Sequence, residues 1–203
     1  MTGFSQFSFE AAGARKIVFF KGQGPGILLM HELPGMIEEC VALANHIEAQ
    51  GYTVFLPLLF GEANITFSRA RTALYTAQIC VSREILAFAE EKDSPITNWL
   101  RALARDIRTR CADGRGIGVI GMCLTGGFVI NLMVEDVVLA PVACQPSLPF
   151  TAFGASPASL GVSVETLGAA KRRAAGVRGG VASGERPCGR QRPRARESLP
   201  DIK

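Results

Sequence analysis

Short, continuous apolar runs recur along the first three quarters of the chain, and each ends in a break rich in glycine, proline or polar residues. Such runs are typical of strands that are buried on both faces of a parallel sheet. They predict strands at residues 27–30, 52–56, 117–120 and 137–142. Two earlier β-prone segments, 7–10 and 16–21, flank a short turn and predict an N-terminal hairpin.

Between these strands, apolar residues return every three or four positions, which is the spacing of one face of an α-helix. This spacing predicts helices at 36–50, 96–111 and 127–133, a further helix at 164–173, and a mostly helical stretch over 65–92. Strands that alternate with helices form parallel sheets with right-handed crossovers. The expected fold class is therefore α/β, a mostly parallel sheet with flanking helices.

Composition narrows the class of protein. Of the 203 residues, 48% are hydrophobic and 20% are charged, which excludes a wholly disordered, collagen-like or coiled-coil chain. The sequence has no apolar run near the ~18 residues of a membrane span, and the first residues lack the apolar centre of a signal peptide. We therefore expect a cytoplasmic protein without a membrane partner.

The net charge of +4 is unevenly distributed. Residues 1–170 hold 12 Lys and Arg against 15 Asp and Glu, whereas residues 171–203 hold 10 against 3. From Gly176 onward glycine, arginine and proline dominate, so we predict a folded domain over 1–175 and a poorly ordered basic tail over 176–203. The tail has no aromatic residue for stacking on bases, and nucleic acid is not an expected partner.

Cysteine and histidine limit the chemistry. The six cysteines form no C-x-x-C pair, so neither a metal site nor a disulfide framework is expected, and no cofactor is predicted. The two histidines, His31 and His46, both lie in the first quarter of the chain. A mechanism that needs a distant histidine base must use one of these or do without.

The strongest chemical motif is Val-Ile-Gly-Met-Cys-Leu-Thr-Gly-Gly-Phe at 119–128, a predicted strand, turn and helix. A nucleophile between small residues is the pattern of a nucleophile elbow. The turn strains the backbone of Cys123, so its close neighbours must be small. The following helix N-terminus favours a thiolate and an oxyanion.

Two other interpretations of this segment remain open. The first is a tight strand-to-helix turn with a cysteine that is merely buried. The second is the G-x-G-x-x-G pattern at 116–121, a dinucleotide fingerprint that would have to follow a strand and open a helix. Here the glycines flank and interrupt the predicted strand, which argues against the second interpretation.

A polar segment, His-Glu-Leu-Pro-Gly at 31–35, ends the first buried strand. Ligands of open α/β sheets bind at the carboxyl ends of the strands. A carboxylate at Glu32 can face that crevice, and the N–H of Leu33 can donate to an oxyanion. The alternative is a polar strand end without a chemical role.

Residues 1–150 resemble the dienelactone hydrolase family, a cysteine-nucleophile branch of the α/β-hydrolase fold. The resemblance rests on Gly-Pro-Gly-Ile-Leu-Leu-Met-His-Glu-Leu-Pro-Gly at 24–35, Ala-Gln-Gly-Tyr-Thr-Val-Phe-Leu-Pro at 49–57 and Ile-Gly-Met-Cys-Leu-Thr-Gly-Gly at 120–127. The segments 82–84 and 94–101 are also similar to the family. One departure is Thr125, where the family usually has glycine.

The resemblance implies a role for each matching residue. Cys123 would attack the carbonyl of an ester or lactone, and Glu32 would contact the resting thiol and help to form the thiolate. The N–H groups of Leu33 and Leu124 would make the oxyanion hole, in which each donor is worth on the order of 3 kcal/mol. Water would then clear the acyl-enzyme.

The family completes its site with an aspartate and a histidine near the C-terminus. This chain has no histidine after His46, and Glu185 is the candidate for the acid. An Arg-Gly-Pro mixture stands where an apolar strand is expected, so we predict an incomplete or aberrant C-terminal part. We hypothesise a shift of reading frame near Gly176. The DNA sequence would reject it if neither alternative frame encoded a strand followed by Asp and His.

Four other polar residues are candidates for the base or for binding the substrate. His31 could replace the missing base, although neighbouring strand residues point to opposite faces. Three arginines could bind a substrate carboxylate or could simply be solvated helix charges. These are Arg69, Arg71 and Arg83.

The expected function is that of a dienelactone hydrolase-like enzyme that cleaves a small-molecule ester or lactone through Cys123. Its turnover is expected to be impaired, because the family's C-terminal Asp and His are not found. The alternative is a non-catalytic α/β-hydrolase-like domain that binds small molecules.

Overall fold

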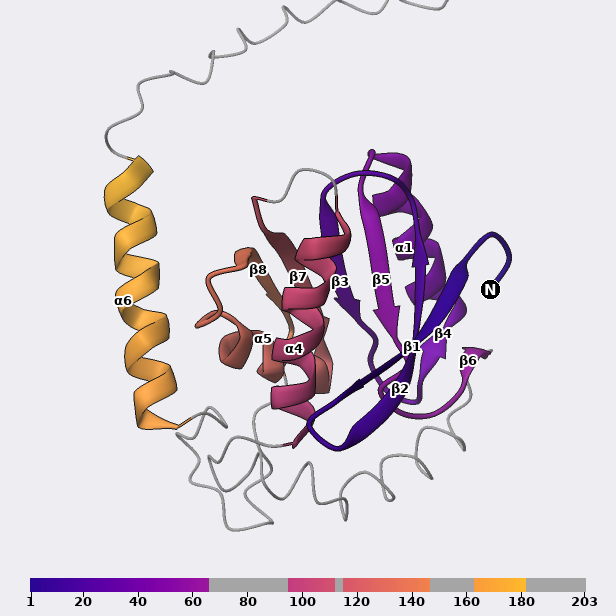
Figure 1. Cartoon of the computed structure of the whole chain (residues 1–203), viewed down its shortest axis with the longest axis horizontal. Helices are drawn as coiled ribbons and strands as arrows, with labels where there is room; N and C mark the ends of the chain where they lie inside the picture. Colours follow the sequence, from indigo (N-terminus) through magenta and orange to yellow (C-terminus); the bar gives the residue numbers. More distant parts are fainter. Residues whose placement is uncertain (66–94, 112–114, 147–162, 182–203) are drawn as a thin grey trace, which may run out of the picture.

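A computed structural model describes residues 1–65, 95–111, 115–146 and 163–181 (Figure 1). Its main sheet has six strands in the order β1-β2-β5-β3-β7-β8. The strands are β1 (Ser5–Ala11), β2 (Ala14–Lys21), β3 (Gly26–Met30), β5 (Thr53–Pro57), β7 (Ile117–Met122) and β8 (Val138–Cys144). A second, two-stranded sheet pairs β4 (Met36–Ile37) with β6 (Ala63–Ile65).

Strands β5, β3, β7 and β8 run parallel to one another. The β1–β2 hairpin is itself antiparallel, and its strand β2 pairs antiparallel with β5. Every residue of β5 is buried, and so is nearly every residue of β3, as the continuous apolar runs predicted. The mostly parallel α/β sheet with flanking helices is therefore confirmed. Its parallel strands end at one common edge, where Met30 of β3 lies opposite Gly121 of β7.

Helices cover both faces of the sheet (Figure 1). On one face, α1 (Glu38–Ala49) buries Cys40 and Ala44 against side chains of β2, β3 and β5. On the other face, α4 (Pro95–Arg110) and α5 (Gly126–Leu132) form the larger core. A single 3-10 turn, η1 (Cys123–Thr125), joins β7 to α5.

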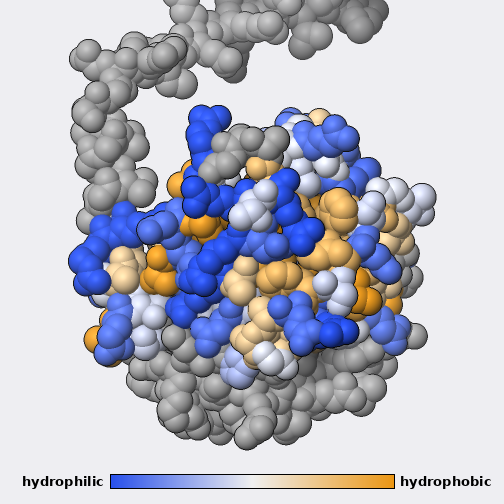
Figure 2. Space-filling view, in the orientation of Figure 1, coloured by the Kyte–Doolittle hydropathy of each residue, from blue (hydrophilic) through white to orange (hydrophobic). Residues whose placement is uncertain are grey.

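The amphipathic character of α4 explains its position. Its apolar stripe is fully buried around Trp99, Leu100 and Leu103. Three of its four arginines, Arg105, Arg108 and Arg110, are exposed. Figure 2 shows this face of the molecule, with hydrophilic residues over α4 and apolar residues over the β1–β2 hairpin. Arg105 joins the helix to the end of α5 through two hydrogen bonds, of 2.8 and 2.9 Å, to the carboxylate of Glu135.

The last helix, α6 (Val164–Val181), docks beside α5 and the start of β8. The guanidinium of Arg173 donates to the backbone oxygens of Glu135, Asp136 and Val138 at 2.6, 3.2 and 2.9 Å. Further along β8 the side chains are open to solvent, and Leu139 and Val142 are 57% and 45% exposed. Within the described residues, β8 is an edge strand of the sheet.

Two predicted helix boundaries differ from the structure by more than one residue. The helix predicted from residue 36 begins at Glu38, because Met36 and Ile37 pair with β6 as a short strand. The helix predicted to end at residue 173 continues as α6 to Val181, across the predicted start of the basic tail. The division into 1–175 and 176–203 stays a prediction.

Some expectations concern residues outside the described part of the chain. The helical stretch over 65–92 lies almost wholly there, as does the tail from residue 182. Among the described helices, none combines the length and the apolar character that a membrane span requires.

Candidate active site

The turn after β7 has the strained backbone that the motif predicted. Cys123 has φ +52°, a left-handed conformation that costs a residue with a Cβ on the order of 1–2 kcal/mol. The side chain is partly exposed at the start of η1. Because the first N–H groups of a helix lack acceptors within it, the N–H of Leu124 belongs to a set that can bind an anion.

Small residues make this turn possible. A Cβ on Gly121 would lie 2.5 Å from the backbone oxygen of Thr125 and 2.7 Å from Cγ2 of Val129. A Cβ on Gly126 would lie 2.9 Å from Cα of Pro146. The helix therefore starts in direct contact with the strands beneath it, which leaves Cys123 at the carboxyl edge of the sheet.

Thr125 occupies the position that departs from the family pattern, and the structure gives this departure a reason. Its side chain is fully buried, and its hydroxyl accepts from the N–H of Met122 at 3.0 Å. The same hydroxyl has two carbonyl oxygens within reach of its one hydrogen, that of Met122 at 2.9 Å and that of Met30 at 3.2 Å. Thr125 thus connects the ends of β7 and β3.

The end of β3 is held by His31, which is fully buried. Nδ1 lies 3.0 Å from the carbonyl oxygen of Glu32, and Nε2 accepts from the N–H of Leu59 at 3.1 Å. The ring also makes an edge contact with Phe60, at 4.5 Å between ring centres. With Nδ1 as donor and Nε2 as acceptor, the imidazole is neutral.

Electrostatics agree with this neutral state. Burial lowers the pKa of His31 from 6.5 to about 4, and the bond to the carbonyl of Glu32 only partly offsets it. A general base must be able to accept a proton from substrate or water. Since Nε2 of His31 already accepts from Leu59, the structure uses this histidine to hold the chain in place. His46 lies within α1 and is exposed, so it does not share the buried position of His31 at the end of β3.

Glu32 and Cys123 lie at matching positions of neighbouring strand ends. Met30 is opposite Gly121 in the parallel ladder, and each candidate residue stands two positions further along its own chain. Glu32 is half-buried, and its charge also acts on Cys40 of α1. Burial first, and the negative charge of Glu32 second, raise the pKa of Cys40 to about 12. Glu32 therefore lies near Cys40 of α1 and follows the carboxyl end of β3.

Leu33 follows in a turn that is fixed on both sides. The Leu33–Pro34 peptide bond is cis, and a Cβ on Gly61 would lie 2.3 Å from the oxygen of Pro34. The N–H of Met36 then donates to the oxygen of Glu62 at 3.1 Å. The segment that carries Leu33 is thus packed against the chain that leaves β5.

The remaining candidates lie outside the described residues. They are Glu185 and the three arginines Arg69, Arg71 and Arg83. Within the described ranges, no group of three or more His, Cys, Asp or Glu side chains could hold a metal ion.

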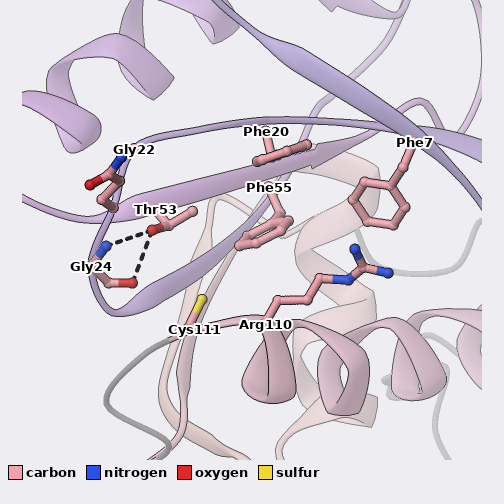
Figure 3. A pocket seen from close by; sticks show the side chains of 9 residues that line it. Phe7, Phe20, Gly22, Gly24, Thr53, Phe55, Arg110 and Cys111 are labelled. Carbon is pink, nitrogen blue, oxygen red and sulfur yellow. Dashed lines mark hydrogen bonds between the residues drawn. The ribbon is translucent and has the colours of Figure 1, made fainter.

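A separate hollow of about 570 Å³ opens at the opposite, amino end of the parallel strands (Figure 3). It is lined by Phe7, Phe20, Gly22, Gln23, Gly24, Thr53, Phe55, Arg110 and Cys111. Two of its polar side chains make contacts within the protein. The hydroxyl of Thr53 exchanges hydrogen bonds of 2.7 and 2.9 Å with Gly24, and Arg110 lies over the ring of Phe7. The length of β7 separates this hollow from Cys123, so the two form distinct sites.

Two features of the site were missed from the sequence. The structural use of His31 depends on Leu59, and the bond of Thr125 to Met30 joins residues 95 positions apart. For Thr125, the sequence signal was a β-branched residue with a hydroxyl in a turn that otherwise favours glycine. No local pattern distinguishes a buried, bonded histidine from a reactive one.

The sequence pattern of the dienelactone hydrolase family matches residues 14–155, more than half of the chain. A comparison with curated protein sequences gives no match.

Solved structures of similar fold include two relatives of this kind. A dienelactone hydrolase-like promiscuous phosphotriesterase from metagenomic libraries is 17% identical, with a TM-score of 0.53, and the match covers 84% of this chain and 75% of that one. A protein from Klebsiella pneumoniae described as a dienelactone hydrolase is 13% identical, with a TM-score of 0.55 over 86% and 81% of the two chains. At these identities the likeness concerns the fold. The family match and the elbow at Cys123 together show that this chain belongs to the dienelactone hydrolase family.

Proposed function

We propose that this protein is a hydrolase of small carboxylic esters or lactones with Cys123 as its nucleophile. The observation that carries the proposal is the positive φ of Cys123 at the turn between β7 and η1. A strained backbone held by close neighbours on both sides is typical of functional positions. Of the four described cysteines, Cys40 and Cys111 are buried, whereas Cys123 is partly exposed and Cys144 is exposed at the end of β8. Cys123 is the one of these four that has a positive φ.

The reaction would begin at the sulfur of Cys123. Glu32 takes the thiol proton, and the thiolate attacks the carbonyl carbon of the ester. The N–H groups of Leu33 and Leu124 donate to the oxyanion that forms, and such donors contribute most when charge develops in the transition state. The C–O bond then breaks, the leaving alkoxide takes from Glu32 the proton that came from the thiol and departs as the alcohol, and a thioester remains on Cys123.

Hydrolysis of that thioester is the slow step in this proposal. This step needs a base to activate water. The sequence contains only two histidines, His31 and His46. His31 is bonded on both ring nitrogens, and His46 is exposed on α1. Glu32 would be the remaining base beside the thioester, so acylation is expected to outrun deacylation.

The test is a pre-steady-state measurement with an activated aryl ester such as 4-nitrophenyl acetate. We expect one equivalent of nitrophenol per chain in a burst, followed by slow turnover, with the acetyl group found on the Cys123 peptide by mass spectrometry. Cys123→Ala should abolish the burst. Cys144→Ala, at an exposed cysteine of β8, is the matched control and should leave it unchanged.

The alternative is a non-catalytic domain that binds small molecules. It is favoured by the engagement of His31, which leaves the site without a histidine base at the position described. The same experiment separates the two functions. If wild type gives no burst, or Cys123→Ala retains it, Cys123 is not the nucleophile and the hydrolase proposal fails.

A further inference from the structure

The hydroxyl of Thr125 joins two chain segments that carry different parts of the proposed site. It accepts a hydrogen bond from the N–H of Met122 at 3.0 Å. As donor it has two carbonyl oxygens within reach, that of Met122 at 2.9 Å and that of Met30 at 3.2 Å. A hydroxyl has one hydrogen and two lone pairs, so these contacts use its hydrogen and one of its lone pairs.

The side chain that carries this hydroxyl is buried. Thr125 and Met30 are both fully buried, and the missing side chain of Gly121 leaves only enough room for the backbone of Thr125. Removing the hydroxyl would leave the N–H of Met122 without that partner. This N–H is partly buried, and a donor shielded from water that loses its acceptor is left with an uncompensated desolvation cost. The turn would therefore shift until this N–H finds another acceptor.

The two anchored residues stand one and two positions before the reactive ones. Met122 precedes Cys123, and Met30 stands two residues before Glu32. The ladder between β3 and β7 ends at Met30 and Gly121, so the hydroxyl extends the connection beyond the last matched pair. A shift of Met122 or Met30 is thus transmitted to the distance between the carboxylate and the thiol.

We propose that Thr125 is a positioning residue, which holds the Glu32–Leu33 segment at a fixed place relative to Cys123. The proposal rests on the function proposed above. Thr125 touches no substrate in this scheme, because its side chain is fully buried beneath the turn. Its effect is on the ease with which Glu32 takes the proton of Cys123, and hence on the reactivity of the thiol.

The experiment compares three variants by alkylation of Cys123 with iodoacetamide over a range of pH, followed by peptide mass mapping. Thr125→Val keeps the shape and removes the hydroxyl, Thr125→Ala removes it with less bulk, and Thr125→Ser keeps it. For Val and Ala we expect alkylation at neutral pH to fall on the order of tenfold, with the pH–rate profile displaced to higher pH, as sub-ångström misplacement produces. For Ser we expect the wild-type profile. Cys144, measured in the same samples, should react at an unchanged rate.

Each contrary result overturns the inference. A folded Val or Ala variant with the wild-type profile shows that the hydroxyl does not position the site. A Ser variant as impaired as Val shows that the methyl group is responsible. If far-UV circular dichroism finds both Val and Ala unfolded, Thr125 has a purely structural role. Alkylation requires no ester cleavage, so this outcome is separate from that of the burst experiment, whose failure would overturn only the hydrolase function.

Discussion

The ends of β3 and β7 are the same kind of structure put to different uses. Each is a parallel strand that stops at the carboxyl edge and leads through a turn into a helix. At the end of β3 the reactive type of side chain, His31, is buried and bonded to backbone on both nitrogens. At the end of β7 it is the alcohol of Thr125 that holds the backbone, while Cys123 stays partly exposed.

The difference teaches that residue type does not assign chemistry in this fold. Histidine is the usual base and threonine a common core residue, yet here both hold chain segments in place. What distinguishes Cys123 is its backbone: a positive φ that glycine neighbours permit. The following experiments test this contrast, beginning with the largest expected effect.

The end of β7 should tolerate no added side chain at Gly121. We expect Gly121→Ala to lower the free energy of unfolding by about 3 kcal/mol, because its Cβ would meet the backbone oxygen of Thr125 at 2.5 Å. Urea denaturation measures this. Gly118→Ala is the control within the same strand, since its Cβ would meet only the tip of the flexible Ile27 side chain at 2.6 Å. Equal losses in both variants would show that the turn is not specially tight.

The end of β3 should lose stability in acid through His31. The folded-state pKa of about 4 lies below the ordinary 6.5, so the unfolded chain takes up the proton first as pH falls. The contribution of neutral His31 to the free energy of unfolding is complete above pH 6.5 and is lost as the pH falls toward 4. Between pH 7 and pH 5 it amounts to about 2 kcal/mol.

The variant His31→Gln isolates this contribution, because its amide oxygen can still accept from the N–H of Leu59. Urea denaturation at several pH values should show a flatter dependence for His31→Gln than for wild type. His46→Gln, at an exposed position of α1, should follow wild type. A His31→Gln curve parallel to that of wild type would mean that His31 is not held neutral by burial.

The smallest effect concerns the strain at Cys123 itself. A left-handed backbone suits glycine, so Cys123→Gly should be more stable than Cys123→Ala by about 1 kcal/mol. The thermal midpoints of the two variants give the comparison. The same pair at Cys144, within β8, should show the opposite order, because glycine weakens a strand. Greater stability of the Ala variant at position 123 would contradict a strained elbow.

Much of the fold was predictable because it depends on local patterns. The runs at 27–30 and 52–56 predicted β3 and β5 to within a residue, since a strand covered on both faces must be apolar throughout. The short strand β4 was not predicted, because its pairing with β6 depends on a partner more than twenty residues away. The elbow at Cys123 was predictable from its small neighbours.

The connections within the site were less accessible. That Thr125 binds Met30, or that Leu59 binds His31, follows from sheet order, which a single sequence does not display. The sequence did indicate Glu32 as a residue at a strand end. Its nearness to Cys40 depends on the packing of α1 against the sheet, which the sequence does not display.

The bond between Thr125 and Met30 has a consequence for the order of folding. It joins residues 95 positions apart, whereas the β1–β2 hairpin closes within a few residues. Contacts between distant residues form late, because closing a long loop costs entropy before any contact repays it. A chain emerging from the ribosome can complete its hairpin and the α1 crossover well before β7 arrives. The proposed nucleophile and its carboxylate would then meet only in the last stage of assembly.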